Sequence, residues 1–533
     1  MSKPDVPAPA EPRGSGAAAA LVSSGILVSR LLGVVRQSFM ARYLGATTGI
    51  AADAFMAAFK IPNLLQNLFG EGAMSASFVP VYSKLLAKNE REEAQKVAGA
   101  VAAILTLVTA VLVLVGVLIT PYLIPLIAPG FTGEKRELTI RLTRVLFPGA
   151  GIFVISAWCQ GVLNSHRKFF LPYVAPALWN VAMIGALLGF GGRQDRVTLA
   201  VTLGWASVVG AGLQFVIQLP TVFRVLGRLQ LSLDRTRSNV RKVLSNFTPV
   251  FFSRGVVQVS TYVDQLLASL LPQGMVALLG YATTIYTLPV SLFGMAISVA
   301  ELPEMSSVIG DESEVATVLR ARLNAGLRHI AFFVIPSAAA FLTLGNVIAR
   351  ALFQSGHFTE TDTIFTWGIL AGSSVGLLAS TLGRLYSSTY YALHDTRTPL
   401  RFAVVRVSLT TVLGYLFAIP LPGLLGIDQR WGAAGLTASA GIAGWIEFVL
   451  LRSRLNRRIG VTGLPKPYVA MLWLSAVVAA AAAFVIGREL HPTHRFVYAT
   501  IVLGAFALVY GALTLAFGIP EAHVLVARVR RRR

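Results

Sequence analysis

The chain has 533 residues, of which 55% are hydrophobic and only 13% are charged, and its mean hydropathy is +0.68. Soluble domains contain about 25% charged residues, so this composition excludes a soluble globular protein and indicates an integral membrane protein. The net charge is +22, but the Lys and Arg residues lie mostly in short connections, where positive charge sets membrane topology. No basic patch interleaved with aromatic residues lies outside the hydrophobic segments, and we expect no nucleic-acid partner.

The N-terminal segment, residues 1–16, is rich in Pro, Ala and Gly and has no apolar core. This composition predicts a disordered cytoplasmic tail. The apolar segment that follows contains Arg30 and Arg36 and shows no clear cleavage site. It therefore predicts a membrane span rather than a cleaved signal peptide.

Hydropathy averaged over about 19 residues predicts about fourteen membrane spans. The predicted spans cover residues 17–40, 49–72, 95–121, 142–164, 170–190, 197–220, 245–270, 275–300, 328–350, 364–392, 401–422, 431–452, 467–487 and 495–518. With the N-terminus in the cytoplasm, the connections rich in Lys and Arg fall on the cytoplasmic side. This asymmetry favours an even number of spans and two cytoplasmic termini.

Short motifs recur along the chain at a nearly constant spacing. Ser29-Arg30 recurs as Ser253-Arg254, and the Leu-Phe-Gly run 68–70 recurs at 292–294, in both cases 224 residues later. Transporters are often built from such repeats, with the binding site between them. The repeat predicts an all-α polytopic fold with two pseudo-symmetric six-helix lobes and two further C-terminal helices. The predicted segments are an N-lobe at 17–232, a C-lobe at 233–455, the last two spans at 456–520 and a basic cytoplasmic tail at 521–533.

Charged side chains inside the first two spans are the strongest functional signal. A charge at the bilayer centre costs about 2.5–3.5 kcal/mol on insertion scales. These two spans nevertheless carry Arg30, Arg36, Asp53, Lys60 and Glu71. The charges of the second span share one helical face by their spacing. Any one of them has the alternative of a structural ion pair or of reaching the membrane interface, but the set predicts a polar cavity within the bilayer, and therefore transport.

Polar stripes also mark the seventh and eighth spans. The seventh carries Arg254, Gln258, Thr261 and Gln265 on one face, with Asp264 beside them. The eighth carries hydroxyl side chains at 284, 287, 291 and 298 and a glycine at 294. Facing the first two spans, these helices would enclose a hydrophilic cleft. Its cations outnumber its carboxylates, and because arginine pairs bidentately with phosphate, the cleft favours a phosphorylated or otherwise anionic amphipathic substrate.

Several runs of residues resemble the MurJ/MviN lipid II flippases. They are SRLLGVVRQSFMARYLG (29–45), ADAFMAAFKIPNLLQNLFGEGAMSASFVPVYSK (52–84), GVLNSHRKFFLPYVAPALWN (161–180), LFQSGHFT (352–359) and YYALHDTRTP (390–399). The resemblance covers roughly residues 20–460. It implies a multidrug/oligosaccharidyl-lipid/polysaccharide exporter fold with fourteen helices in the bacterial plasma membrane. It also implies movement of an undecaprenyl-pyrophosphate-linked peptidoglycan precursor from the inner to the outer leaflet.

The resemblance also implies site residues. Polar positions of the family's central cavity are matched here by Ser29, Arg30, Arg36, Asp53, Lys60 and Glu71, and Asp264 matches an acidic position. Among these, Arg36 is the best candidate for the pyrophosphate. The predicted substrate-binding set is completed by Arg254 and Gln265.

The chain also departs from the family pattern. Gln66 and Gln265 stand where arginine is common, and Gln37 stands where an acidic residue is common. Threonines at 283, 284 and 287 occupy positions that are frequently charged. Glutamine can hydrogen-bond a phosphate but supplies no charge. These departures therefore leave open whether the cargo is lipid II or another lipid-linked anion.

The leading interpretation is a lipid II flippase that works by alternating access, with membrane lipids and the lipid-linked precursor as its partners. Two alternatives stay open: a flippase for another lipid-linked oligosaccharide or amphipathic anion, and a transport-dead scaffold that binds cell-wall synthesis proteins. We expect no enzyme, because no metal constellation or nucleophile–base pair is apparent. No soluble cofactor is expected. The coupling ion is open, since Asp53, Glu71 and Asp264 are candidates for protons or sodium and the membrane potential is a further drive.

Overall fold

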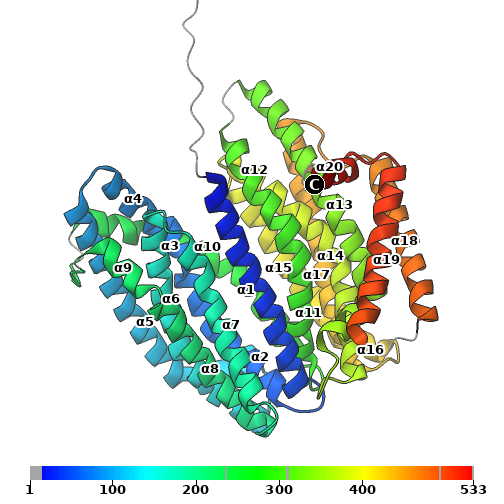
Figure 1. Cartoon of the computed structure of the whole chain (residues 1–533), viewed down its shortest axis with the longest axis horizontal. Coiled ribbons are helices and arrows are strands. Elements are labelled where there is room, and N and C mark those ends of the chain that lie inside the picture. Colours follow the sequence, from blue (N-terminus) through cyan, green and yellow to red (C-terminus); the bar gives the residue numbers. More distant parts are fainter. Residues whose placement is uncertain (1–14, 228, 235–236, 308–310, 491–493, 531–533) are drawn as a thin grey trace, which may run out of the picture.

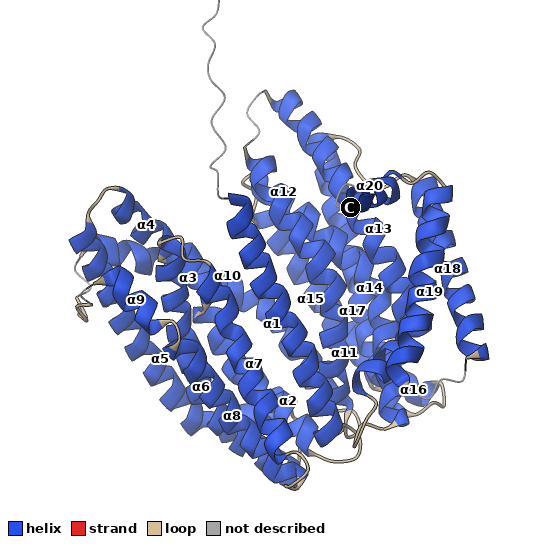
Figure 2. Cartoon of the chain, viewed as in Figure 1, coloured by secondary structure: helices blue, strands red, loops and turns tan. Residues whose placement is uncertain are grey.

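The computed structural model describes residues 15–227, 229–234, 237–307, 311–490 and 494–530, which form helices and loops without a strand among them (Figure 2). Eleven helical segments of this part are long and apolar enough to cross a membrane. The other three predicted spans fall on α1 (Ser15–Leu44), α2 (Ala51–Phe69) and α10 (Ser238–Ser269), the helices with the predicted cavity charges. The all-α membrane fold is confirmed, and the count of fourteen spans stays a prediction.

Two groups of helices lie on either side of α1 in Figure 1, and α10, the first helix of the C-lobe, is labelled on the N-lobe side next to α3. The N-lobe is completed by α3 (Glu71–Ser77), α4 (Val79–Ala87), α5 (Arg91–Ile127), α6 (Gly133–Ser165), α7 (Phe170–Phe190), α8 (Arg196–Val216) and α9 (Leu219–Leu226). The C-lobe consists of α10, α11 (Met275–Pro289), a π-helical turn (Val290–Met295), α12 (Ala296–Ser306), α13 (Glu312–Phe353), α14 (Glu360–Ala392), α15 (Arg397–Ala418), α16 (Pro420–Leu424), a 3-10 turn (Gln429–Trp431) and α17 (Gly432–Ile459). The last helices, α18 (Lys466–Glu489), α19 (Arg495–Ala516) and α20 (Pro520–Arg530), pack against α13.

The predicted internal repeat is confirmed by how the helices pack. In the N-lobe α6 contacts α2, α5 and α8, and α7 contacts α1 and α8. In the C-lobe α14 makes the corresponding contacts with α11, α13 and α17, and α15 with α10 and α17. Helices α2 and α11 begin 224 residues apart, which is the spacing of the sequence motifs. Each lobe therefore buries its helices in the same order.

A matching turn supports the same repeat. Arg167 follows α6 and His394 follows α14, and both have left-handed backbones, with φ of 57° and 58°. In each turn the amide of the next residue donates to the carbonyl oxygen five residues back, at 2.9 Å. This bond pattern closes a helix end by satisfying its last carbonyls. The two turns lie 227 residues apart.

The second predicted span is divided in the structure. Helix α2 ends at Phe69 and α3 begins at Glu71, because Gly70 adopts an extended ψ of −153° between them. The prediction that Glu71 shares one helical face with Asp53 and Lys60 is therefore wrong. Sequence spacing assumed one continuous helix, whereas the chain turns so tightly at Gly70 that a Cβ atom there would lie only 2.2 Å from the Gln66 carbonyl oxygen.

Small residues allow close packing in the C-lobe. A Cβ atom on Gly441 of α17 would lie only 2.6 Å from the backbone nitrogen of Gly376 of α14. Membrane helices associate through such small residues, since lipid supplies no hydrophobic drive for helix–helix contact. Helices α14 and α17 therefore pack closely together, and α11 packs against α14 while α10 contacts α17.

Candidate functional site

A cavity of about 260 Å³ lies between α1 of the N-lobe and α11 of the C-lobe, and we call it the inter-lobe cavity. Its lining residues are Arg30, Gly33, Val34, Arg36, Gln37, Thr283, Thr284, Thr287 and Leu288. Their spacing of three to four residues places each set on one face of its helix. The two predicted arginines of α1 thus meet the threonine stripe of α11.

The α1 wall of the cavity is cationic. The guanidinium of Arg36 lies 4.3 Å from the ring centre of Trp179, and its Nη1 is 3.7 Å from Met183 Sδ. Its Nε is buried and has no hydrogen-bond partner. Within the described residues, neither Arg30 nor Arg36 forms an ion pair with a carboxylate. Positive charge is therefore left available to a ligand.

The α11 wall is uncharged and presents hydroxyl oxygens. Thr283 donates to the carbonyl oxygen four residues back at 2.6 Å, Thr284 does so at 3.1 Å and Thr287 at 2.6 Å. Such bonds are common for threonine in helices. Because each hydroxyl hydrogen is engaged, the oxygen lone pairs remain as acceptors. The cavity thus has hydrogen-bond donors on one wall and acceptors on the other.

A second polar contact between the lobes joins α2 and α10. The hydroxyl of Tyr262 donates to the carbonyl oxygen of Lys60 at 2.9 Å, and the Lys60 ammonium attracts the carboxylate of Asp264. Asp264 Oδ1 and Gln265 Nε2 are buried without a hydrogen-bond partner among the described residues. The predicted residues of α2 and α10 therefore do face one another, although they lie outside the lining of the inter-lobe cavity.

The two lobes join at one end of the molecule, which we call the closed end, formed by the loops 45–50, 270–274 and 354–359. The amide of His357 donates to the Arg42 carbonyl oxygen at 2.8 Å. Gln273 Nε2 donates to the Thr47 carbonyl oxygen at 3.1 Å. In Figure 1 this end lies at the bottom, where the loops after α1 and α10 meet.

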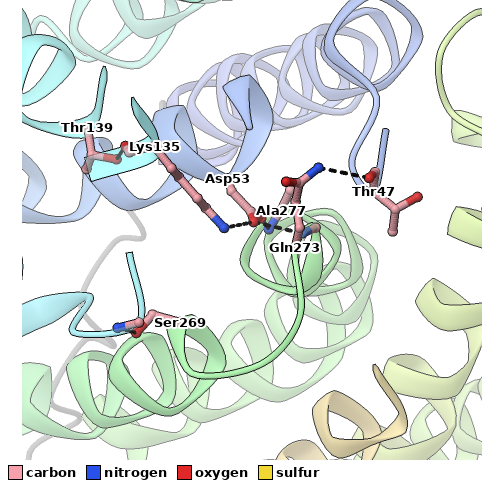
Figure 3. A network of polar contacts seen from close by, with 9 residues as sticks. Thr47, Asp53, Lys135, Thr139, Ser269, Gln273 and Ala277 are labelled. Atoms are coloured by element: carbon pink, nitrogen blue, oxygen red, sulfur yellow. Dashed lines mark hydrogen bonds and ion pairs between the residues drawn. The ribbon is translucent and has the colours of Figure 1, made fainter. Parts of the chain in front are cut away.

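Asp53 is the central residue of the closed end. Its side chain is 1% exposed, and it pairs with Lys135 Nζ at 2.5 Å within the N-lobe. It also accepts hydrogen bonds from the amides of Gly274 and Ala277, both at 2.8 Å (Figure 3). These amides belong to the N-terminal turn of α11, where a carboxylate satisfies free N–H groups and is favoured by the helix dipole. Asp53 thus caps a helix of the opposite lobe.

Asp362 is a closed-end residue that the sequence analysis missed. Its Oδ1 accepts bonds from the Thr47 amide at 3.0 Å and from Thr47 Oγ1 at 2.6 Å, across the lobe boundary. Its Oδ2 accepts from the Thr359 amide at 2.9 Å, which completes a capping box at the start of α14. The pattern Thr-x-x-Asp before an apolar run was the available signal. Lys135 was also missed, because it lies 82 residues after Asp53 in the sequence and no local spacing links the two.

The remaining predicted site residues lie apart from these two regions. The Ser29 carbonyl oxygen accepts a bond from Asn180 Nδ2 at 3.3 Å, beside the cavity. Glu71 is exposed at the start of α3. Arg254 belongs to α10, but its side chain lies outside the described part of the structure. Of the predicted set, the structure therefore brings only Arg30 and Arg36 into the lining of the inter-lobe cavity, and a substrate role for each residue of the set stays a prediction.

Comparison with known proteins decides the family. Residues 40–507 match the family described as "Lipid II flippase MurJ". The chain belongs to the MurJ family. It is 33% identical over 445 residues to a probable lipid II flippase MurJ of Rhizobium tropici, covering 82% of this chain and 80% of that protein. It is 32% identical over 445 residues to the lipid II flippase MurJ of Burkholderia cenocepacia, covering 82% and 83%.

Solved structures show the same fold. The structure titled "Lipid II flippase MurJ, inward closed conformation" matches with a TM-score of 0.78 and 24% identity, covering 93% of this chain and 98% of that one. An inward-facing multidrug resistance MATE family transporter of the MOP superfamily matches with a TM-score of 0.62 and 16% identity, covering 83% and 98%. The chain is thus a multi-pass membrane transporter, and the family predicted from the sequence motifs is confirmed.

Proposed function

We propose that this MurJ-family chain moves lipid II, the undecaprenyl-pyrophosphate-linked peptidoglycan precursor, from the inner to the outer leaflet of a bacterial plasma membrane. The observation that carries the proposal is the inter-lobe cavity, in which Arg30 and Arg36 have no carboxylate partner among the described residues. An unpaired charge inside a membrane is costly, and such residues mark substrate pathways. A pyrophosphate would supply the missing negative charge, since arginine binds phosphate oxygens with two parallel hydrogen bonds.

The two walls of the cavity fit the two chemical parts of this cargo. The α1 arginines suit the pyrophosphate, and the acceptor oxygens of the α11 threonines suit the sugar hydroxyls and amide N–H groups of the precursor. The prenyl chain would remain in the lipid, because its transfer into a polar cavity has no driving force. Each part of the amphipathic precursor thereby has a matching environment.

The contrast between the closed end and the cavity supports a cycle of alternating access. With the N-terminus in the cytoplasm, α1 ends on the outer side of the membrane, so the closed end lies at the outer face. The lobes would then be sealed outward by Asp53 and Asp362, while the cavity receives cargo from the inner leaflet. Release requires these cross-lobe bonds to break as the lobes rock about the cavity.

Asp264 is the carboxylate that we propose for a coupling ion. Of the three candidates, Asp53 is already occupied by Lys135 and two amides, and Glu71 is exposed at the start of α3. Asp264 keeps a buried oxygen without a hydrogen-bond partner and lies near the charges of Lys60 and Arg406. The cycle needs no soluble cofactor, and the membrane potential acts on the cationic cavity directly.

The test is transport by the purified protein in vesicles that carry fluorescent lipid II, together with rescue of a bacterium depleted of its own flippase. Arg36→Ala should lower the transport rate by about 100-fold or more, since two charge-assisted hydrogen bonds are lost. Arg144→Ala is the matched control, because this exposed arginine of α6 only donates to the Val117 carbonyl oxygen. Normal transport by a well-inserted Arg36→Ala protein contradicts the proposal.

A second cargo is favoured by one specific observation. The α11 wall is built from threonines at positions that are frequently charged in the family, so the cavity has less positive charge than expected for a family member. Another lipid-linked oligosaccharide or amphipathic anion would suit such a wall. Competition between lipid II and defined lipid-linked glycans in the vesicle assay separates the two cargoes. A scaffold for cell-wall synthesis proteins would instead show no transport and no loss of function in Arg36→Ala.

A further inference from the structure

The cation of Arg36 is held in an unusual way for a charge in a membrane protein. Intramembrane cations usually pair with a carboxylate or with backbone carbonyl groups. Arg36 has neither kind of partner in the described structure, and its Nε is buried without any hydrogen bond. Its closest polar contact is the weak acceptor Met183 Sδ, at 3.7 Å. Something other than a counter-ion must therefore keep the guanidinium in place.

The indole of Trp179 lies against this guanidinium, and the distance from its ring centre to Arg36 Cζ is 4.3 Å. Tryptophan has the most favourable aromatic face for a cation, and the attraction is larger when water is excluded. Trp179 itself does not line the inter-lobe cavity. It therefore contacts Arg36 from outside the lining of the cavity.

The indole is fixed in orientation by three other helices. Its Nε1 donates to Ser207 Oγ of α8 at 3.0 Å. Phe59 of α2 and Phe153 of α6 contact the ring, with ring centres 5.7 Å and 5.8 Å away. A Cβ atom at Gly210 of α8 would lie 2.9 Å from the indole Cδ1, so the glycine provides the space for the ring. These contacts keep the aromatic face turned toward α1.

We propose that Trp179 is a positioning residue that holds Arg36 in the cavity as a cation without neutralising it. A carboxylate in this place would cancel the charge and would compete with an anionic ligand for the same N–H donors. An aromatic face stabilises the guanidinium through the ring quadrupole and leaves its charge and its in-plane N–H donors to the ligand. This role rests on the proposed function, because it assumes that the ligand of Arg36 is the pyrophosphate group.

The experiment measures binding of undecaprenyl pyrophosphate to the purified full-length chain in detergent. Trp179→Leu, which removes the aromatic face, should weaken binding about 5- to 30-fold, the range of a desolvated cation–π contact. Trp179→Phe keeps an aromatic face and should bind within about threefold of the natural protein. Trp205→Leu is the matched control, because Trp205 is 56% exposed on α8 and has no contact with Arg36.

A double-mutant cycle separates positioning from general damage to the fold. In an Arg36→Gln background, Trp179→Leu should cause no further loss of binding, because Trp179 acts only through Arg36. Undecaprenol, which lacks the pyrophosphate, should bind equally to all these variants. Thermal unfolding of the ligand-free proteins shows whether Trp179→Leu remains folded. If it does not, comparison of Trp179→Phe with the natural protein still tests whether an aromatic ring at this position is enough for binding.

Each outcome has a definite meaning. Weaker binding by Trp179→Leu that Phe restores, and that disappears in Arg36→Gln, supports the role. Equal losses in both backgrounds, or a loss that extends to undecaprenol, overturn it and leave Trp179 as a packing residue. Binding by the natural protein that is lost in Arg36→Gln but kept in Trp179→Leu overturns the role of Trp179 alone. An absence of binding by the natural protein overturns both this role and the proposed function.

Discussion

The closed end and the inter-lobe cavity are both polar regions between the same two lobes, yet their polar groups are treated in opposite ways. At the closed end, Asp53 has three partners and Asp362 has bonds to both of its oxygens. In and near the cavity, atoms of Arg36, Gln37 and Asp264 are buried without any partner. A buried polar group without a hydrogen bond costs about 1–3 kcal/mol, more if charged. We interpret the satisfied groups of the closed end as contacts that hold the lobes together, and the unpaired cation of Arg36 in the cavity wall as a group available to a ligand.

The largest expected effect comes from weakening the contacts of the closed end. Asp53→Asn removes the counter-charge of Lys135 within the N-lobe in both arrangements of the lobes. Only the bonds from the Gly274 and Ala277 amides exist solely when the lobes meet, and a hydrogen bond to a charged group contributes about 1.5–3 kcal/mol against about 0.5–1.5 kcal/mol for a neutral one. Loss of the charge from these two bonds should lower the ratio of closed to open protein by about 30-fold or more.

Cross-linking across the closed end measures this ratio. Thr48→Cys and His357→Cys introduce a pair on exposed loops of opposite lobes, where Thr48 Oγ1 lies 3.5 Å from the His357 carbonyl oxygen. The single natural cysteine, Cys159, is buried and does not interfere. Asp428→Asn is the control, since it changes an exposed carboxylate whose ion pair with Arg430 spans 3.9 Å. Unchanged cross-linking in Asp53→Asn would show that this carboxylate does not hold the lobes together.

An intermediate effect of opposite sign, an increase in stability, is expected at Gln265 of α10. Gln265 is 2% exposed and its Nε2 has no partner, so Gln265→Leu removes an unsatisfied amide from the interior. The ligand-free protein should become more stable by about 1–2 kcal/mol, while transport becomes slower if the amide serves the cargo. Thermal unfolding and vesicle transport of the same preparation measure both quantities. A variant that is less stable than the natural protein would mean that Gln265 is satisfied in the native state.

The smallest effect concerns the acceptor wall. Thr284→Val preserves the shape of the side chain and removes the hydroxyl oxygen that faces the cavity. One lost neutral hydrogen bond corresponds to about 0.5–1.5 kcal/mol, so binding of lipid II should weaken by a factor of about 2 to 12. Undecaprenyl pyrophosphate, which has no sugar, should bind as before. Equal weakening for both lipids would place the pyrophosphate, rather than the sugars, against α11.

The sequence by itself determined the membrane fold, the repeat and the family. Long apolar segments must form helices in lipid, because every backbone N–H and C=O group needs an internal partner there. The recurring motifs reported the repeat since each lobe buries its helices in the same way. Arg30 and Arg36 could be predicted as cavity residues for a physical reason. A charge in an apolar membrane segment is unfavourable in lipid and therefore faces a cavity, a charged partner or the membrane interface.

Only the tertiary structure decided what the individual polar residues do. Asp53 and Arg36 give the same sequence signal, a charge in an apolar segment. In the structure, Asp53 is bonded to Lys135 and to the amides at the start of α11, whereas Arg36 packs against the indole of Trp179. The partners of Asp53 lie 82 to 224 residues away in the sequence, and the partner of Arg36 lies on another helix, α7. Glu71 left the predicted face because Gly70 turned the chain. Whether a polar group has a hydrogen-bond or ion-pair partner depends on residues that are distant in the sequence and that only folding brings together. The local spacing of residues therefore cannot predict these partners.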